Sequence, residues 1–120
     1  MLQQIVRLRV SMTVNEGQMD SFKQVAQEMT EATESEPDAL GYEWFAGPGQ
    51  NVFTLLETYL NSAAVEKHFT GPVVQQLVPK LAAVVSIRAF EIYGDPGSIV
   101  AGMARGFGAE IYPYWTGLKR

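Results

Sequence analysis

The chain has 120 residues, a net charge of −4, no cysteine and one histidine, and 47% of its residues are apolar. The missing cysteines exclude disulfides, thiolate metal sites and a cysteine nucleophile. Lys and Arg are scattered, which argues against a nucleic-acid partner, and no apolar run approaches the ~20 residues of a membrane span, so a soluble, cytoplasmic protein is expected.

The first half of the chain predicts a strand, a helix and a hairpin. Apolar and polar residues alternate over residues 5–14, which is the period of a strand. Apolar residues then recur every three or four positions over residues 19–32, which predicts an amphipathic helix with an acidic, solvated face. Residues 42–46 and 52–59 are rich in aromatic and β-branched types, and the Gly- and Pro-containing turn between them predicts a hairpin.

The second half predicts further helices and a fourth strand. Asn61 or Ser62 is placed to cap a short helix that ends before Gly71, and a helical stretch disturbed by Pro79 follows. Residues 84–93 have strand composition. The resulting order is the split βαβ pattern of the ferredoxin-like fold, an α+β fold with a four-stranded antiparallel sheet and helices on one face. The other face would be bare, so we expect a second copy of the chain to cover it.

Residues 97–120 form a C-terminal extension to this domain of residues 1–96. Ile99, Met103, Phe107 and Ile111 are spaced four apart and predict a helix, although each of the three nearby glycines weakens it by ~1 kcal/mol relative to Ala. Residues 111–115 are too aromatic for a disordered end. We therefore expect the extension to pack on the domain or its dimer partner, with the neighbouring subunit and the pocket mouth as the two alternatives for its tail.

The single histidine is the natural candidate for a general base, because imidazole gains and loses a proton near neutral pH. His68 shares one side of its predicted helix with Ala64 and Val65, which directs it toward the sheet. A half-buried histidine bonded to the backbone is the structural alternative. One histidine also excludes a multi-histidine metal site within one chain, and no metal is expected.

Two residues of the predicted hairpin have unusual environments. Trp44, with Tyr42 on the same strand face, either stacks on a planar ligand or fills the core. Glu57 lies inside an apolar strand, where a carboxylate needs a partner. We expect a structural ion pair at the dimer face in preference to a catalytic role. The candidate partners on neighbouring strands are Arg7, Arg9 and Arg88.

Residues 55–69, LLETYLNSAAVEKHF, resemble the signature of the antibiotic biosynthesis monooxygenase domain family. In that signature an apolar strand ends in Glu-x-Trp/Tyr, and a capped helix with an Ala and a His follows. The matching residues are Glu57, Tyr59, Ala64 and His68. The first strand and acidic helix match as well, so the resemblance covers about residues 4–93. It implies a ferredoxin-like subunit that forms a dimeric α/β barrel, with a pocket between each sheet and its own helices.

The resemblance further implies a monooxygenase that oxidises an electron-rich quinol or polycyclic phenol with O2 and without a cofactor. Such a reaction requires a base and a dry pocket, and His68 would be the base. The residues implied to place the small aromatic substrate are Trp44 and Tyr59, with Val10, Met12, Phe53 and Phe90 as apolar walls. A non-catalytic homodimer that binds or senses a small molecule in the same pocket is the alternative.

Overall fold

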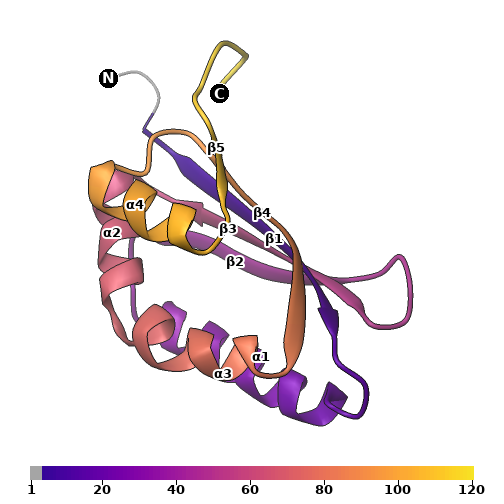
Figure 1. Ribbon diagram of the computed structural model, residues 1–120. Helices are drawn as coiled ribbons and strands as arrows, with labels where there is room; N and C mark the ends of the chain where they lie inside the picture. Colours follow the sequence, from indigo (N-terminus) through magenta and orange to yellow (C-terminus); the bar gives the residue numbers. More distant parts are fainter. Residues whose placement is uncertain (1–3) are drawn as a thin grey trace.

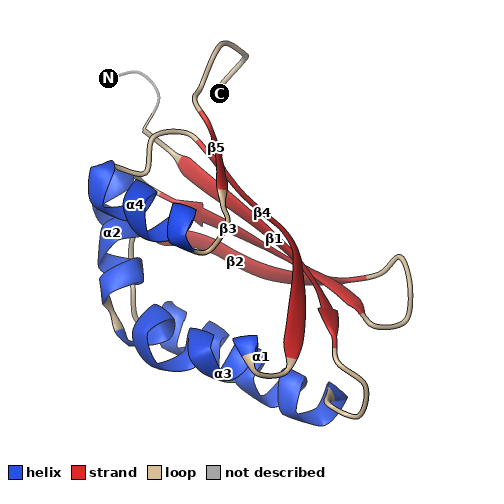
Figure 2. Ribbon diagram, viewed as in Figure 1, coloured by secondary structure: helices blue, strands red, loops and turns tan. Residues whose placement is uncertain are grey.

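A five-stranded sheet carries helices on one face in the computed structural model of the chain, which describes residues 4–120 (Figures 1 and 2). The strands are β1 (Val6–Val14), β2 (Ala39–Ala46), β3 (Val52–Tyr59), β4 (Val85–Tyr93) and β5 (Glu110–Tyr112). The helices are α1 (Met19–Glu34), α2 (Ser62–Thr70), α3 (Val78–Ala82) and α4 (Ser98–Gly106), with a π-helical turn at Val73–Leu77. The strand order is β2-β3-β1-β4-β5, and only the β4–β5 pair is parallel.

The predicted α+β, ferredoxin-like fold is confirmed, but the sheet has five strands where four were expected. The fifth strand comes from the C-terminal extension, in which the predicted helix is shorter than its apolar spacing suggested. The backbone N–H of Gly108 donates to Arg105 and that of Ala109 donates to Ala104, which is the Schellman end of a helix. Gly108 has a φ of +87°, which suits glycine, and Ile111 then pairs with Ile92 in the sheet.

Two core clusters lie between the sheet and the helices. One lies beneath α2 and α4 and includes Val6, Phe69 and Val100, all of them buried. The other lies against α1 and α3 and includes Phe22 and Leu81. The two groups of helices are separated in Figure 1. Pro79 lies in the first turn of α3, directly after the π-helical turn.

No helix of the described part of the chain covers the opposite face of the sheet, as predicted (Figure 2). Strand alternation turns Phe45, Leu56, Tyr93 and Tyr112 to this side, and each is at least 39% exposed. The rings of Tyr93 and Tyr112 stack with centroids 5.1 Å apart. Within residues 4–120, no helix combines the length and the apolar character that a membrane crossing requires.

The C-terminal extension packs on the chain's own domain as far as β5. Helix α4 contacts α2, and β5 extends the sheet edge beside β4. Residues 113–120 then run past the end of the sheet (Figure 1), and Trp115 is 90% exposed. None of these tail residues lines the pocket, so the tail does not cover the pocket mouth of its own chain.

Candidate functional site

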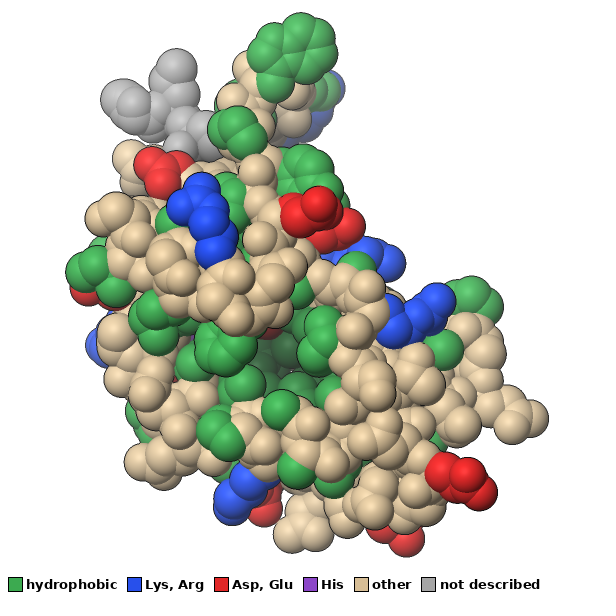
Figure 3. Space-filling model, viewed as in Figure 1, with side chains coloured by type: hydrophobic (Ala, Val, Ile, Leu, Met, Phe, Trp, Pro, Cys, Tyr) green, Lys and Arg blue, Asp and Glu red, His purple; other side chains and the backbone are tan. Residues whose placement is uncertain are grey.

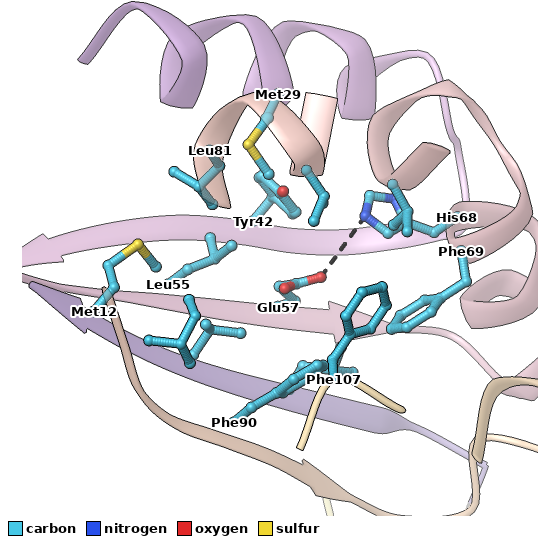
Figure 4. Close-up of a pocket in the computed structure, with 15 residues that line it drawn as sticks. Met12, Met29, Tyr42, Leu55, Glu57, His68, Phe69, Leu81, Phe90 and Phe107 are labelled. Carbon is cyan, nitrogen blue, oxygen red and sulfur yellow. Dashed lines mark ion pairs between the residues drawn. The ribbon is translucent and has the colours of Figure 1, made fainter. Parts of the chain in front are cut away.

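A cavity of about 130 Å³ lies between the sheet and the helices, where the two core clusters meet (Figure 4). Its polar lining consists of Tyr42, Glu57 and His68, and the rest is apolar. The apolar lining includes Leu8, Met12, Met29, Leu55, Leu81 and Phe90. Figure 3 shows the opening as a hollow bordered mainly by hydrophobic side chains, between α4 and α3.

Strand alternation places Glu57 in this cavity. Glu57 pairs with Leu8 of β1, and both side chains face the helices. The hydroxyl of Tyr59 donates a hydrogen bond of 2.5 Å to Oε1 of Glu57, and Nε2 of His68 lies 3.8 Å from the same oxygen. Burial raises the pKa of Glu57, and the nearby His68 and the Tyr59 hydrogen bond oppose this shift only in part.

The predicted ion pair between Glu57 and an arginine at the dimer face is wrong. Arg7 and Arg9 flank Leu8 along β1, so they point to the opposite face of the sheet from Glu57. Arg9 instead forms an ion pair of 3.2 Å with Glu91. Arg88 is exposed, at the irregularity where the β1–β4 register shifts. No arginine among residues 4–120 forms an ion pair with Glu57.

His68 lies beside Glu57 and faces a carboxylate from each of its ring nitrogens. Its Nδ1 is 3.0 and 3.2 Å from the two carboxylate oxygens of Glu36, and its Nε2 faces Glu57. The side chain of Asn61 accepts a hydrogen bond from the N–H of Ala64 and caps α2, which fixes the turn that carries His68. The predicted inward direction is therefore right, and the partners of His68 are carboxylates in place of the backbone groups that we considered.

Two tyrosines complete the polar part of the site. The ring of Tyr42 lies 5.6 Å from that of His68, and the ring of Tyr59 lies 5.2 Å from it. Burial and the charge of Glu57 raise the pKa of Tyr42 and of Tyr59. Both phenols therefore keep their protons at neutral pH, and the hydroxyl of Tyr59 donates to Glu57.

The residues that were predicted to contact the aromatic ring of the substrate divide into two groups. The residues that line the cavity are Val10, Met12 and Phe90, and those that do not are Trp44, Phe53 and Tyr59. The indole of Trp44 donates a hydrogen bond of 2.9 Å to Thr30, and its ring packs edge-on against Phe22. Phe53 packs against Phe22 as well. Trp44 and Phe53 thus fill the core beneath α1, which is the alternative that we left open for Trp44.

The site residues that were not predicted from the sequence include Glu36 and Phe107. Glu36 is one of seven acidic residues over residues 16–38, and no local pattern distinguishes it from the others. Phe107 lies in the extension, between two glycines, and it lines the cavity although it was placed only on the apolar stripe of a helix.

The arrangement of acidic residues around His68 differs from that of a metal site. Glu36 and Glu57 face different nitrogens of the imidazole, so the three side chains do not converge on one point. Within residues 4–120, no group of three or more His, Cys, Asp or Glu side chains is placed to hold a metal ion.

Comparisons with known proteins connect this site with a family. The model of the antibiotic biosynthesis monooxygenase family matches residues 5–80. No curated protein matches the chain significantly. Among solved structures, MupZ from Pseudomonas fluorescens superposes with a TM-score of 0.81 at 17% identity, covering 98% of this chain and 96% of MupZ. The likeness to MupZ therefore includes the C-terminal extension.

Two further structures match the domain. A protein described as a possible antibiotic biosynthesis monooxygenase from Caulobacter crescentus CB15 has a TM-score of 0.67 at 17% identity, covering 75% of this chain and 86% of its own. SnoaB, a cofactor-independent oxygenase from Streptomyces nogalater, has a TM-score of 0.67 at 12% identity, covering 81% and 98%. At these identities the structures establish a shared fold. Because the family model matches more than half of the sequence, the chain belongs to the antibiotic biosynthesis monooxygenase family.

Proposed function

We propose that the chain is a cofactor-independent monooxygenase that oxidises an electron-rich quinol or phenol with O2. The observation that carries the proposal is a carboxyl–imidazole pair, Glu57 and His68, that lines an otherwise apolar cavity. Membership of the family supports it, and so does the likeness to SnoaB, which is described as a cofactor-independent oxygenase.

The pair supplies a base in a site with little water. A base is most effective when its pKa lies near the working pH, and burial raises the pKa of Glu57 toward that range. The carboxylate of Glu57 takes a proton from the substrate, while the hydroxyl of Tyr59 holds the carboxylate in position. His68 stands next to Glu57 and acts with it, so the base expected from the sequence becomes a pair of residues.

The reaction balances with O2 as the only co-reactant. Loss of a proton from a ring carbon that carries two hydrogens, in the keto form of a phenol, gives an electron-rich anion. One electron passes to O2, the two radicals combine into a C–O bond, and the peroxide takes up a proton. Removal of the second hydrogen breaks the O–O bond, so the carbon becomes a carbonyl and the other oxygen leaves as water. The substrate supplies all the electrons.

The size of the cavity limits what part of a substrate it encloses. Its volume of about 130 Å³ is close to that of an apolar cavity of ~150 Å³ that encloses benzene. We therefore expect the reacting ring to enter the cavity and the rest of a polycyclic phenol to lie at the mouth. Phe107 and Ile87, both about half exposed, line the cavity and are available for that contact.

We also propose that the chain acts as a homodimer in which the open sheet face of one copy packs on that of the other. The support is the set of exposed apolar side chains on this face, which includes Phe45, Leu56 and Tyr93. A dimer of this kind leaves each pocket between a sheet and its own helices.

The proposal is tested by following O2 uptake with a panel of quinols and phenols of one to three rings. We expect turnover by the wild type, and a kcat lowered by ~100 to 10,000-fold in Glu57→Gln and in His68→Ala, as is typical for a lost acid–base group. Glu31→Gln removes an exposed carboxylate from α1, away from both the pocket and the open sheet face, and is the matched control. Tight binding of panel members without any O2-dependent turnover would favour the binding or sensing module instead.

A further inference from the structure

His68 separates two spaces in the structure. On the Nε2 side lies the apolar cavity with Glu57. On the Nδ1 side, Glu36 belongs to a second cleft between the α1–β2 loop and α2. The residues that line this cleft include Glu36, Asp38, Asn61, Ala64 and Lys67. The imidazole lines the apolar cavity, and its hydrogen bond to Glu36 connects it with the surface cleft.

We infer that His68 and Glu36 form a proton relay between Glu57 in the pocket and water in this cleft, with Glu36 as the outer proton acceptor. The inference rests on the proposed function for the source of the proton, because it is the oxidation that loads Glu57. It assigns to Glu36 a role in moving protons that goes beyond holding the ring of His68.

The geometry provides a path with one gap, between His68 and Glu57. Both carboxylate oxygens of Glu36 are within hydrogen-bond distance of Nδ1, at 3.0 and 3.2 Å. The gap of 3.8 Å between Nε2 and Glu57 is longer than a hydrogen bond, and a small rotation of either side chain closes it. The side chains of His68 and Glu36 are 2% and 14% exposed, so the path leads outward to solvent.

The neighbours of Glu57 leave few other routes for its proton. Around His68 the titratable groups are Glu57 and Tyr59 of β3, Tyr42 of β2 and Glu36. The two phenols keep their protons, so neither of them accepts another one. The remaining lining of the cavity is apolar. Imidazole is the neighbour that accepts a proton on one nitrogen and releases one from the other.

The relay also returns to its starting state within one reaction. When Glu57 gives its proton to Nε2, the proton on Nδ1 moves to Glu36 and from there to water, which leaves the Nε2–H tautomer. When the peroxide later takes up a proton, the same steps run inward and restore the Nδ1–H tautomer. The oxidation of a CH2 group to a carbonyl releases no net proton, so one outward and one inward transfer balance.

The experiment exploits the fact that His68 is the only histidine of the chain. In protein with 15N-labelled histidine, the imidazole gives a single set of signals, and its N–H exchange with water is measured without substrate. Glu36→Gln keeps an oxygen that accepts the Nδ1–H hydrogen bond but cannot take up the proton. We expect N–H exchange of the imidazole to be at least about tenfold slower in this variant than in the wild type, because a carboxylate base is lost. Glu36→Asp keeps a carboxylate and should exchange closer to the wild type.

Asp38→Asn is the matched control, because Asp38 lines the same cleft and forms no ion pair with His68. Exchange at the wild-type rate in Glu36→Gln, or equal slowing in Asp38→Asn, would overturn the relay. This readout needs no turnover, so it stands even if the monooxygenase proposal fails. With an active substrate, Glu36→Gln should lower kcat at unchanged KM, and small diffusible buffer acids should restore it.

Discussion

At the scale of single residues, the position of Glu57 determines its chemistry. It is 6% exposed, and burial raises its pKa. The folded chain therefore binds this proton more tightly than the unfolded chain, in which a Glu titrates near ~4.3. Below that value both states are protonated, and the stability of the fold is unaffected. As the pH rises through the folded pKa, the buried carboxylate has to ionise and the folded state loses stability.

Glu57→Gln should therefore stabilise the protein above the pH at which Glu57 ionises. Gln keeps the shape and an oxygen for the Tyr59 hydroxyl, but it carries no charge. The melting temperature should exceed that of the wild type at and above neutral pH, by about 4 °C for each kcal/mol in a domain of this size, and the difference should shrink toward pH 4. Glu31→Gln, exposed on α1 and away from the open sheet face, is the control. A difference that does not change with pH would contradict the buried charge.

The residues of the site could be predicted only in part. Helical spacing was enough to direct His68 inward, because Ala64 and Val65 share its side of α2. The partners of Glu57 were predicted wrongly because β3 has apolar residues on both faces, so alternation alone does not tell which face is buried. Glu36 approaches His68 only through the fold, across 32 positions of sequence. A contact of that kind leaves no local signal.

At the scale of elements, the strongly periodic segments were predicted best. Helix α1 and strand β1 follow their apolar patterns closely, and both are confirmed. The extension was predicted less well, because its helix ends at a Schellman motif between glycines and β5 is only three residues long. Such a short strand forms because β4 offers a sheet edge to pair with, which is a tertiary effect.

The end of α4 places Phe107 at the mouth of the pocket, and we expect Phe107→Ala to weaken ligand binding. A loss of ~50 Å² of apolar contact at about 25 cal/mol per Å² corresponds to about tenfold in Kd for a one-ring phenol. Ile99→Ala is the control, because Ile99 has the same 54% exposure on the same helix and does not line the cavity. The melting temperatures of both variants should stay close to that of the wild type. Equal affinities in the two variants, measured by titration calorimetry, would show that Phe107 is not part of the binding surface.

At the scale of the whole molecule, the sheet divides two kinds of surface. Its inner face forms the core and the pocket, and its outer face carries exposed apolar residues among charged ones. The uncovered face was predicted from the order of elements, because a single layer of helices covers only one side of a sheet. The order of elements within one chain does not determine what covers the outer face. We proposed that a second copy of the chain covers it.

A charge on the outer face of the sheet should prevent the proposed dimer from forming. Leu56 lies on β3, on the outer face, and is 39% exposed in the single chain. Leu56→Lys puts a charge where the two sheets would meet, and an unpaired charge in an interface is unfavourable. Light scattering should give twice the 13.2 kDa of one chain for the wild type at micromolar concentration, and a mass close to one chain for the variant.

Ile99→Lys adds the same charge to an exposed position on α4, away from the sheet, and should leave the mass of the assembly unchanged. The circular dichroism of both variants should match that of the wild type, because both side chains are partly exposed and substitution leaves the core intact. A wild-type protein that is folded and monomeric at these concentrations would rule out the face-to-face dimer. In that case the apolar side chains of the outer face would require a different partner.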